Sequence, residues 1–120
     1  SRLRWKPYLK GGSREDAVEI REYPVRVTDI DLFDHMNNSV YWTVIEDYLF
    51  SHPVLLEKPL RVAIEHDAAV ALGEKLEILS HVHPAGSTDK FGEDLTDRTV
   101  RTLTYAVGDE TKAVAALFPL

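Results

Sequence analysis

The chain has 120 residues, which is enough to bury the core of one domain and too short for two ordinary ones. It contains no cysteine, which excludes disulfides, thiolate nucleophiles and zinc sites built on thiolates. The net charge of −6 argues against general nucleic-acid binding, and no apolar stretch approaches the roughly 18 residues that span a bilayer. We therefore expect a cytoplasmic protein that binds neither nucleic acid nor membrane.

Positive charge is concentrated before the first acidic residue, Glu15. The basic positions are Arg2, Arg4, Lys6, Lys10 and Arg14. This arm is either a solvated linker or a strip that docks on an acidic partner with the help of long-range steering. We divide the chain into a basic arm over residues 1–14 and one domain over residues 15–120, and the initial Ser suggests a piece of a longer protein.

Residues 16–28 alternate between apolar and polar side chains, with Tyr23, Val25 and Val27 on one side. This period of two predicts a strand with one buried face. Pro24 interrupts the pattern, which indicates an edge position or a bulge.

From Ser39 the apolar period becomes helical. The stripe consists of Val40, Tyr41, Val44, Ile45, Tyr48 and Leu49. Residues 37–39 (Asn-Asn-Ser) are all suitable N-caps, and Pro53 marks the far end. The width of the stripe predicts a long, largely buried helix.

Four further strands are expected, over residues 60–71, 74–83, 99–107 and 112–118. Gly108-Asp109-Glu110 joins the last two as a β-hairpin, and residues 84–96 read as a loop. One long helix and about five antiparallel strands predict an α+β fold, in which a curved sheet wraps the helix.

Most familiar site motifs are absent from the sequence. Asp29, Asp31 and Asp34 resemble the start of a calcium loop, but the positions that require Gly and Glu hold Asp34 and Val40. His81 and His83 lack a third ligand, and no nucleophile elbow, P-loop or dinucleotide fingerprint is present. We therefore predict no metal site and no cofactor.

The stretch TDIDLFDHMNNSVYW (28–42) carries the strongest chemical signal. It places the carboxylate of Asp31 and the imidazole of His35 beside the N-terminus of the predicted helix. Free N–H groups and the positive dipole end at such a terminus can hold a developing oxyanion. The alternative is that Asp and Asn stand here because helix starts favour them.

This stretch resembles the pattern D-x-D-x-x-x-H-x-N-N-x-x-Y-x-x-W-x-E of the acyl-acyl-carrier-protein thioesterases, a family with the hotdog fold. The matching residues are Asp29, Asp31, His35, Asn37, Asn38 and Tyr41, with Trp42 and Glu46 close to register. Residues 61–78 (RVAIEHDAAVALGEKLEI) resemble the family's next strand pair, with its Ile-Glu-Tyr start and its glycine turn. Plant members carry two hotdog domains in tandem, and the chain resembles the C-terminal one.

The resemblance implies hydrolysis of fatty acyl thioesters, with acyl-carrier protein preferred over coenzyme A. Asp31 would be the general base, His35 or Asn37 a polarising donor, and the helix N-terminus the oxyanion hole. Residues expected to contact the substrate are Phe33, Asn38, Val40, Tyr41 and Val44. The expected partner is a second hotdog domain, in a homodimer or a pseudo-dimer, because pairing would cover an exposed sheet edge.

Two positions depart from the family pattern. Phe33 stands where the family has a catalytic asparagine, and Ala69 stands where a downstream acidic residue is expected. A phenylalanine cannot hydrogen-bond a water or a carbonyl. The chain is therefore either a thioesterase with a reduced site or a non-catalytic half-domain that binds acyl chains beside a catalytic partner. A third hypothesis is that the chain is a related hotdog enzyme, such as a 4-hydroxybenzoyl-coenzyme A thioesterase-like protein or a dehydratase.

Overall fold

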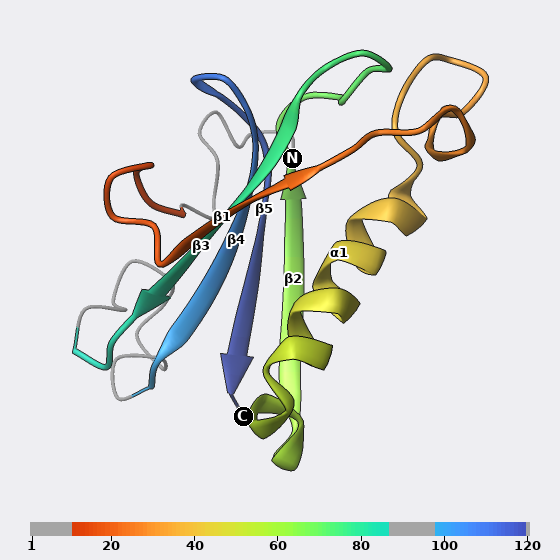
Figure 1. Ribbon diagram of the computed structural model, residues 1–120. Helices are drawn as coiled ribbons and strands as arrows, with labels where there is room; N and C mark the ends of the chain where they lie inside the picture. Colours follow the sequence, from red (N-terminus) through yellow and green to blue (C-terminus); the bar gives the residue numbers. More distant parts are fainter. Residues whose placement is uncertain (1–10, 87–97, 120) are drawn as a thin grey trace, which may run out of the picture.

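Five antiparallel strands form one sheet in the order β1-β3-β4-β5-β2, and a long helix lies along one face of it (Figure 1). The computed structural model describes residues 11–86 and 98–119. The elements are β1 (Glu19–Tyr23), α1 (Asn38–Ser51), β2 (Leu60–His66), β3 (Leu76–His83), β4 (Val100–Val107) and β5 (Glu110–Pro119), with 3-10 turns η1 (Val27–Asp29) and η2 (Pro53–Glu57). This arrangement confirms the predicted α+β hotdog fold.

The hairpin between β4 and β5 forms where the glycine predicted it. Val107 pairs with Glu110, so the loop consists of Gly108 and Asp109 alone. Gly108 has a φ of 59°, a left-handed conformation that costs a glycine little and most other residues more.

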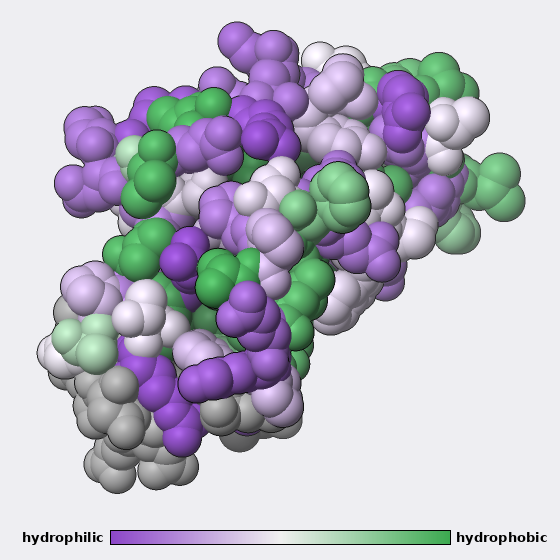
Figure 2. All heavy atoms as spheres, turned by 60° about the horizontal axis from the view of Figure 1, so that its bottom comes forward, coloured by the Kyte–Doolittle hydropathy of each residue, from purple (hydrophilic) through white to green (hydrophobic). Residues whose placement is uncertain are grey.

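Helix α1 is amphipathic rather than buried all round. Val40, Tyr41, Val44, Ile45 and Tyr48 are buried against the sheet. Its other side faces outward, and Phe50 is 85% exposed. The expectation of a largely buried helix is therefore correct for one face only, since the described strands pack on a single side of α1. The face shown in Figure 2 carries hydrophobic side chains in separate groups between hydrophilic ones.

Two strands end earlier than predicted. The strand expected over residues 16–28 ends at Tyr23, because Pro24 has no N–H to continue the ladder. β1 pairs with β3 at the edge of the sheet, as Pro24 indicated. The strand expected over residues 60–71 ends at His66, where Asp67 and Ala68 both donate their N–H groups to the carbonyl oxygen of Lys112, at 2.8 and 3.0 Å.

The end of the basic arm packs against the sheet. His81 Nε2 donates a 2.6 Å hydrogen bond to the carbonyl oxygen of Ser13, and a Cβ at Gly12 would overlap the His81 ring. Arg14 forms an ion pair with Glu77 at 2.9 Å. The rest of the arm, residues 1–10, and most of the predicted loop, residues 87–96, lie outside the described residues. Within the described ranges, no helix is long and apolar enough to cross a membrane.

Candidate active site

The loop before α1 is closed by the side chain of Asp31. Its Oδ1 accepts hydrogen bonds from the N–H groups of Phe33 at 2.8 Å and His35 at 3.1 Å. The N–H of Asp31 donates to the carbonyl oxygen of His35 at 2.8 Å. Asp34 completes the turn in the left-handed region, with a φ of 61°. One carboxylate oxygen of Asp31 therefore shapes the loop, whereas Oδ2 accepts no hydrogen bond from the described residues.

Buried contacts hold both ends of this loop. Asp29 is buried, and its Oδ2 accepts a 2.9 Å hydrogen bond from the N–H of Arg26. The carbonyl oxygen of Asp29 accepts from the N–H of Asn37 at 2.8 Å. The N–H of Met36 donates to the carbonyl oxygen of Val70, also at 2.8 Å, which ties the loop to the segment after β2.

The N-terminus of α1 has no side-chain cap within the described part of the chain. Asn37 is the N-cap residue, but its side chain makes no capping hydrogen bond, and the first turn contains no acidic residue. The first N–H groups of a helix have no intrahelical partner, and the helix dipole places partial positive charge beside them. This end of α1 can therefore receive an oxyanion.

The segment after β2 faces this helix N-terminus. The loop before α1 and the end of β2 lie at the same end of the molecule, at the top of Figure 1. The ring of His66 contacts the ring of Tyr41 edge-on, with centroids 4.6 Å apart. Asp67 and Ala68 are held by their hydrogen bonds to Lys112.

Between these two walls lies an open depression with a volume of about 530 Å³. Its lining residues are Asp31, His35, Met36, Asn37, Asn38, Tyr41, His66, Asp67, Ala68 and Ala69. None of these is Lys or Arg, so the charged side chains that the described residues contribute to the depression are acidic. The three residues predicted to be catalytic thus lie around one hollow, together with the predicted contacts Asn38 and Tyr41.

Three other predicted contact residues lie elsewhere. The side chain of Phe33 is 78% exposed on the loop and does not line the depression. Val40 and Val44 are buried in the core between α1 and the sheet. Their contact with a substrate stays a prediction.

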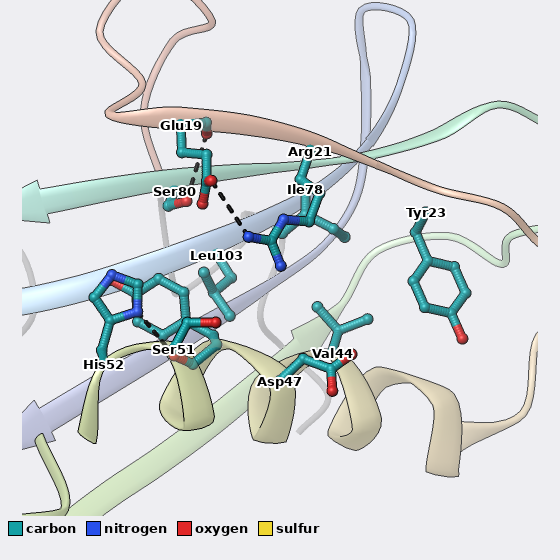
Figure 3. A pocket seen from close by; sticks show the side chains of 11 residues that line it. Glu19, Arg21, Tyr23, Val44, Asp47, Ser51, His52, Ile78, Ser80 and Leu103 are labelled. Atoms are coloured by element: carbon teal, nitrogen blue, oxygen red, sulfur yellow. Dashed lines mark hydrogen bonds and ion pairs between the residues drawn. The ribbon is translucent and has the colours of Figure 1, made fainter.

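Val44 instead lines a smaller cavity between β1 and the C-terminal half of α1 (Figure 3). This cavity has a volume of about 40 Å³ and an apolar floor that includes Ile78 and Leu103. In Figure 3 the guanidinium of Arg21 extends from β1 over the helix, where it meets the Glu19 carboxylate at 3.3 Å. The cavity is too small for a long acyl chain in this conformation.

Tyr41, which lines the depression, is linked to Tyr105 in the core. The hydroxyl of Tyr105 donates a 2.7 Å hydrogen bond to the carbonyl oxygen of Tyr41. Burial raises the pKa of Tyr105 far above its usual value, and burial also raises the pKa of Tyr41, against the opposing effect of the Val70 backbone. Both phenols are therefore protonated at neutral pH.

The histidines considered as metal ligands have structural partners. His81 bonds Ser13, and His83 Nε2 lies 2.8 Å from the hydroxyl of Thr102. Over residues 11–86 and 98–119, no three His, Asp or Glu side chains are grouped as metal ligands would be.

Sequence reasoning did not single out His66 and Asp67, which line the depression. Both fall within the second stretch that resembles the family pattern, where His66 occupies the position of the tyrosine in the Ile-Glu-Tyr start. The only available signal was two adjacent titratable side chains within this stretch, because the strand was expected to continue to residue 71.

Comparison with known proteins gives a consistent family. Residues 12–119 match the family described as "Acyl-ACP thioesterase C-terminal domain". The uncharacterized protein Rv2001 of Mycobacterium tuberculosis is 34% identical over 116 residues, which cover 97% of this chain and 40% of that protein. The chain thus spans well under half the length of this relative.

Solved structures share the fold at low sequence identity. A thioesterase from Thermus thermophilus, complexed with coenzyme A and Zn, has a TM-score of 0.60 at 19% identity, covering 88% of this chain and 82% of that one. The 12:0-ACP thioesterase from Umbellularia californica has a TM-score of 0.60 at 18% identity. That match covers 92% of this chain and 38% of the plant protein.

Proposed function

Because the chain belongs to the family of acyl-ACP thioesterase C-terminal domains, we propose that it hydrolyses fatty acyl thioesters. The observation that carries this proposal is the depression in which Asp31, His35 and Asn37 surround an uncapped helix N-terminus. We further propose that acyl-carrier protein is preferred over coenzyme A as the thiol carrier. The matched family and the 12:0-ACP thioesterase from Umbellularia californica support that preference by their descriptions.

The proposed reaction begins with a water molecule beside Asp31. Oδ2 of Asp31 accepts a proton as the water oxygen bonds to the thioester carbonyl carbon. The carbonyl oxygen becomes an oxyanion, which the N–H groups at the start of α1 stabilise. The C–S bond then breaks, and the leaving thiolate takes up the proton. General-base assistance of this kind is typically worth about 10²–10⁴-fold in rate.

The remaining residues of the depression would orient the substrate. His35 and Asn37 can donate hydrogen bonds to the carbonyl oxygen, and Asn38 and Tyr41 would contact the substrate beside it. The exposed ring of Phe33 would meet the acyl chain or a partner domain. Val40 and Val44 would be reached only if α1 moves relative to the sheet, because both are packed in the core.

We propose that the domain works in a pair with a second hotdog domain, in the cytoplasm. Two features support pairing. β1 and β2 are the outer strands of the sheet, and unpaired strand edges in proteins are usually covered or protected. The outward face of α1 also presents large apolar side chains, including Trp42 and Phe50.

Release of free thiol from a panel of acyl-carrier-protein and coenzyme A thioesters tests the catalytic proposal. Asp31→Asn is the informative variant, since the asparagine oxygen can still accept from Phe33 and His35 and so keep the loop. Asp34→Asn is the matched control, because Asp34 lies in the same loop and does not line the depression. We expect thiol release to be lost in Asp31→Asn and kept in Asp34→Asn.

A non-catalytic half-domain is the second candidate function. The position of Ala69 favours it, because this residue lines the depression without a functional group. In that case the wild-type chain would release no thiol from any member of the panel. It would still bind acyl chains, which a fluorescent fatty acid would detect.

A further inference from the structure

We propose that Asp67 is a second carboxylate of the reacting centre and receives a hydrogen bond from the attacking water. This inference rests on the proposed thioester hydrolysis and adds a catalytic residue to it. In the same step the water transfers its other proton to Asp31 as its oxygen bonds to the carbonyl carbon. Asp67 keeps its negative charge throughout, so the C–S cleavage and the proton balance are those given above.

The first argument is the position of Asp67. It lines the same depression as Asp31, but it comes from the wall formed by the end of β2. The two residues therefore border one hollow from different elements. In the proposed arrangement, a water between Asp31 and Asp67 would donate one hydrogen bond to each carboxylate. These two bonds would set the direction of the lone pair that attacks the carbonyl carbon.

The second argument is that the backbone at Asp67 is held firmly. Its N–H donates to the carbonyl oxygen of Lys112 at 2.8 Å, and the N–H of Ala68 donates to the same oxygen at 3.0 Å. The ammonium of Lys112 is itself held by Glu110 at 3.1 Å and Glu74 at 3.5 Å. Positioning by fixed backbone is what catalytic groups require.

The third argument is that Asp31 alone leaves one hydrogen of the attacking water without an acceptor. Its Oδ1 already accepts two backbone N–H groups, so one oxygen remains for the water. A water has two hydrogens, and an unused hydrogen leaves its orientation undefined. Asp67 is the only other carboxylate among the described residues that line the depression.

The test compares Asp67→Ala, Asp67→Asn and Asp67→Ala/Ala69→Glu in the full chain, with thiol release measured as kcat and KM separately. Ala69 lines the same wall two residues further on, so a glutamate there returns a carboxylate to the depression. We expect kcat to fall about 10- to 100-fold in Asp67→Ala with KM little changed, and to recover at least in part in the double variant. Asp67→Asn should fall less than Asp67→Ala, because its amide oxygen still accepts a hydrogen bond.

The outcomes separate this inference from the proposed function. Turnover lost in Asp31→Asn but unchanged in Asp67→Ala would overturn the role of Asp67 and leave the hydrolysis standing. A second outcome is a failure of the added glutamate to restore kcat in variants whose circular dichroism and melting temperature match the wild type. That result would show that Asp67 only supports the structure of the segment after β2, and it would overturn the inference too. Absence of turnover in the wild-type chain would overturn both.

Discussion

The hydroxyl of Tyr105 donates a hydrogen bond to the carbonyl oxygen of Tyr41 across 2.7 Å, and their ring centroids lie 5.0 Å apart. Tyr105 belongs to β4 and Tyr41 to the first turns of α1, so this bond joins the middle of the sheet to the helix. Tyr41 also contacts His66, which lines the depression. The core of the fold and one wall of the candidate site are thus connected through Tyr41.

Replacing Tyr105 with Phe should lower the free energy of unfolding by about 1 kcal/mol. The substitution removes one buried hydrogen bond and keeps the ring packing, and a net bond of this kind contributes roughly 0.5–1.5 kcal/mol. Urea unfolding followed by circular dichroism measures the change. Thr99→Val, on an exposed position before the same strand, is a control that should leave stability nearly unchanged. Equal stability of Tyr105→Phe and wild type would show that the bond contributes nothing net.

The same tyrosine predicts a loss of stability in alkaline solution. Burial raises the pKa of Tyr105 above the ordinary value of 10.0, so the folded state binds its proton more tightly than the unfolded state does. Stability is therefore unaffected well below pH 10 and falls as pH rises above it, by up to about 1.4 kcal/mol per pH unit for this group. Unfolding free energies measured across that range should decline. In Tyr105→Phe the slope should be smaller, and an identical slope in both proteins would assign the decline to other groups.

Asp31 should separate catalysis from loop structure in a pair of variants. Asp31→Asn keeps an oxygen for the N–H groups of Phe33 and His35, so stability should stay near wild type while thiol release is lost. Asp31→Ala removes that oxygen as well and should cost about 1 kcal/mol in unfolding free energy, as the loss of comparable side-chain caps does. Differential scanning calorimetry and the thiol assay measure the two effects. Comparable destabilisation in both variants would mean that the loop does not depend on the acceptor.

The two faces of α1 should respond differently to truncation. Ile45 is 1% exposed, so Ile45→Ala leaves a cavity in the core and should lower the free energy of unfolding by about 2–5 kcal/mol. Phe50→Ala changes a side chain that is 85% exposed in the single domain and should cost less than about 0.5 kcal/mol.

Protein concentration adds a further test of the outward face. If Phe50→Ala destabilises the protein, and does so more at high than at low concentration, a partner covers this face of the helix. A large loss that is independent of concentration would contradict the exposure of Phe50.

Much of the fold followed from local sequence patterns. The shift from a period of two to a helical period near Ser39 located α1, and the glycine at position 108 located the hairpin. Pro24 correctly indicated an edge strand. The early end of β2 was not predictable, because it depends on Asp67 and Ala68 sharing one acceptor on Lys112, which is 45 residues away in the sequence.

The sequence by itself determined one wall of the candidate site. Asp31, His35 and Asn37 lie within seven residues at a helix start, and hydrogen bonds within the loop hold them close together. Only the tertiary structure decided what stands opposite them. His66 and Asp67 reach the depression because β2 pairs with β5 and because Met36 bonds Val70, and these contacts join segments that are distant in the chain. Val44 is placed in the core for the same reason: the sheet that forms from later strands selects which face of the helix it covers.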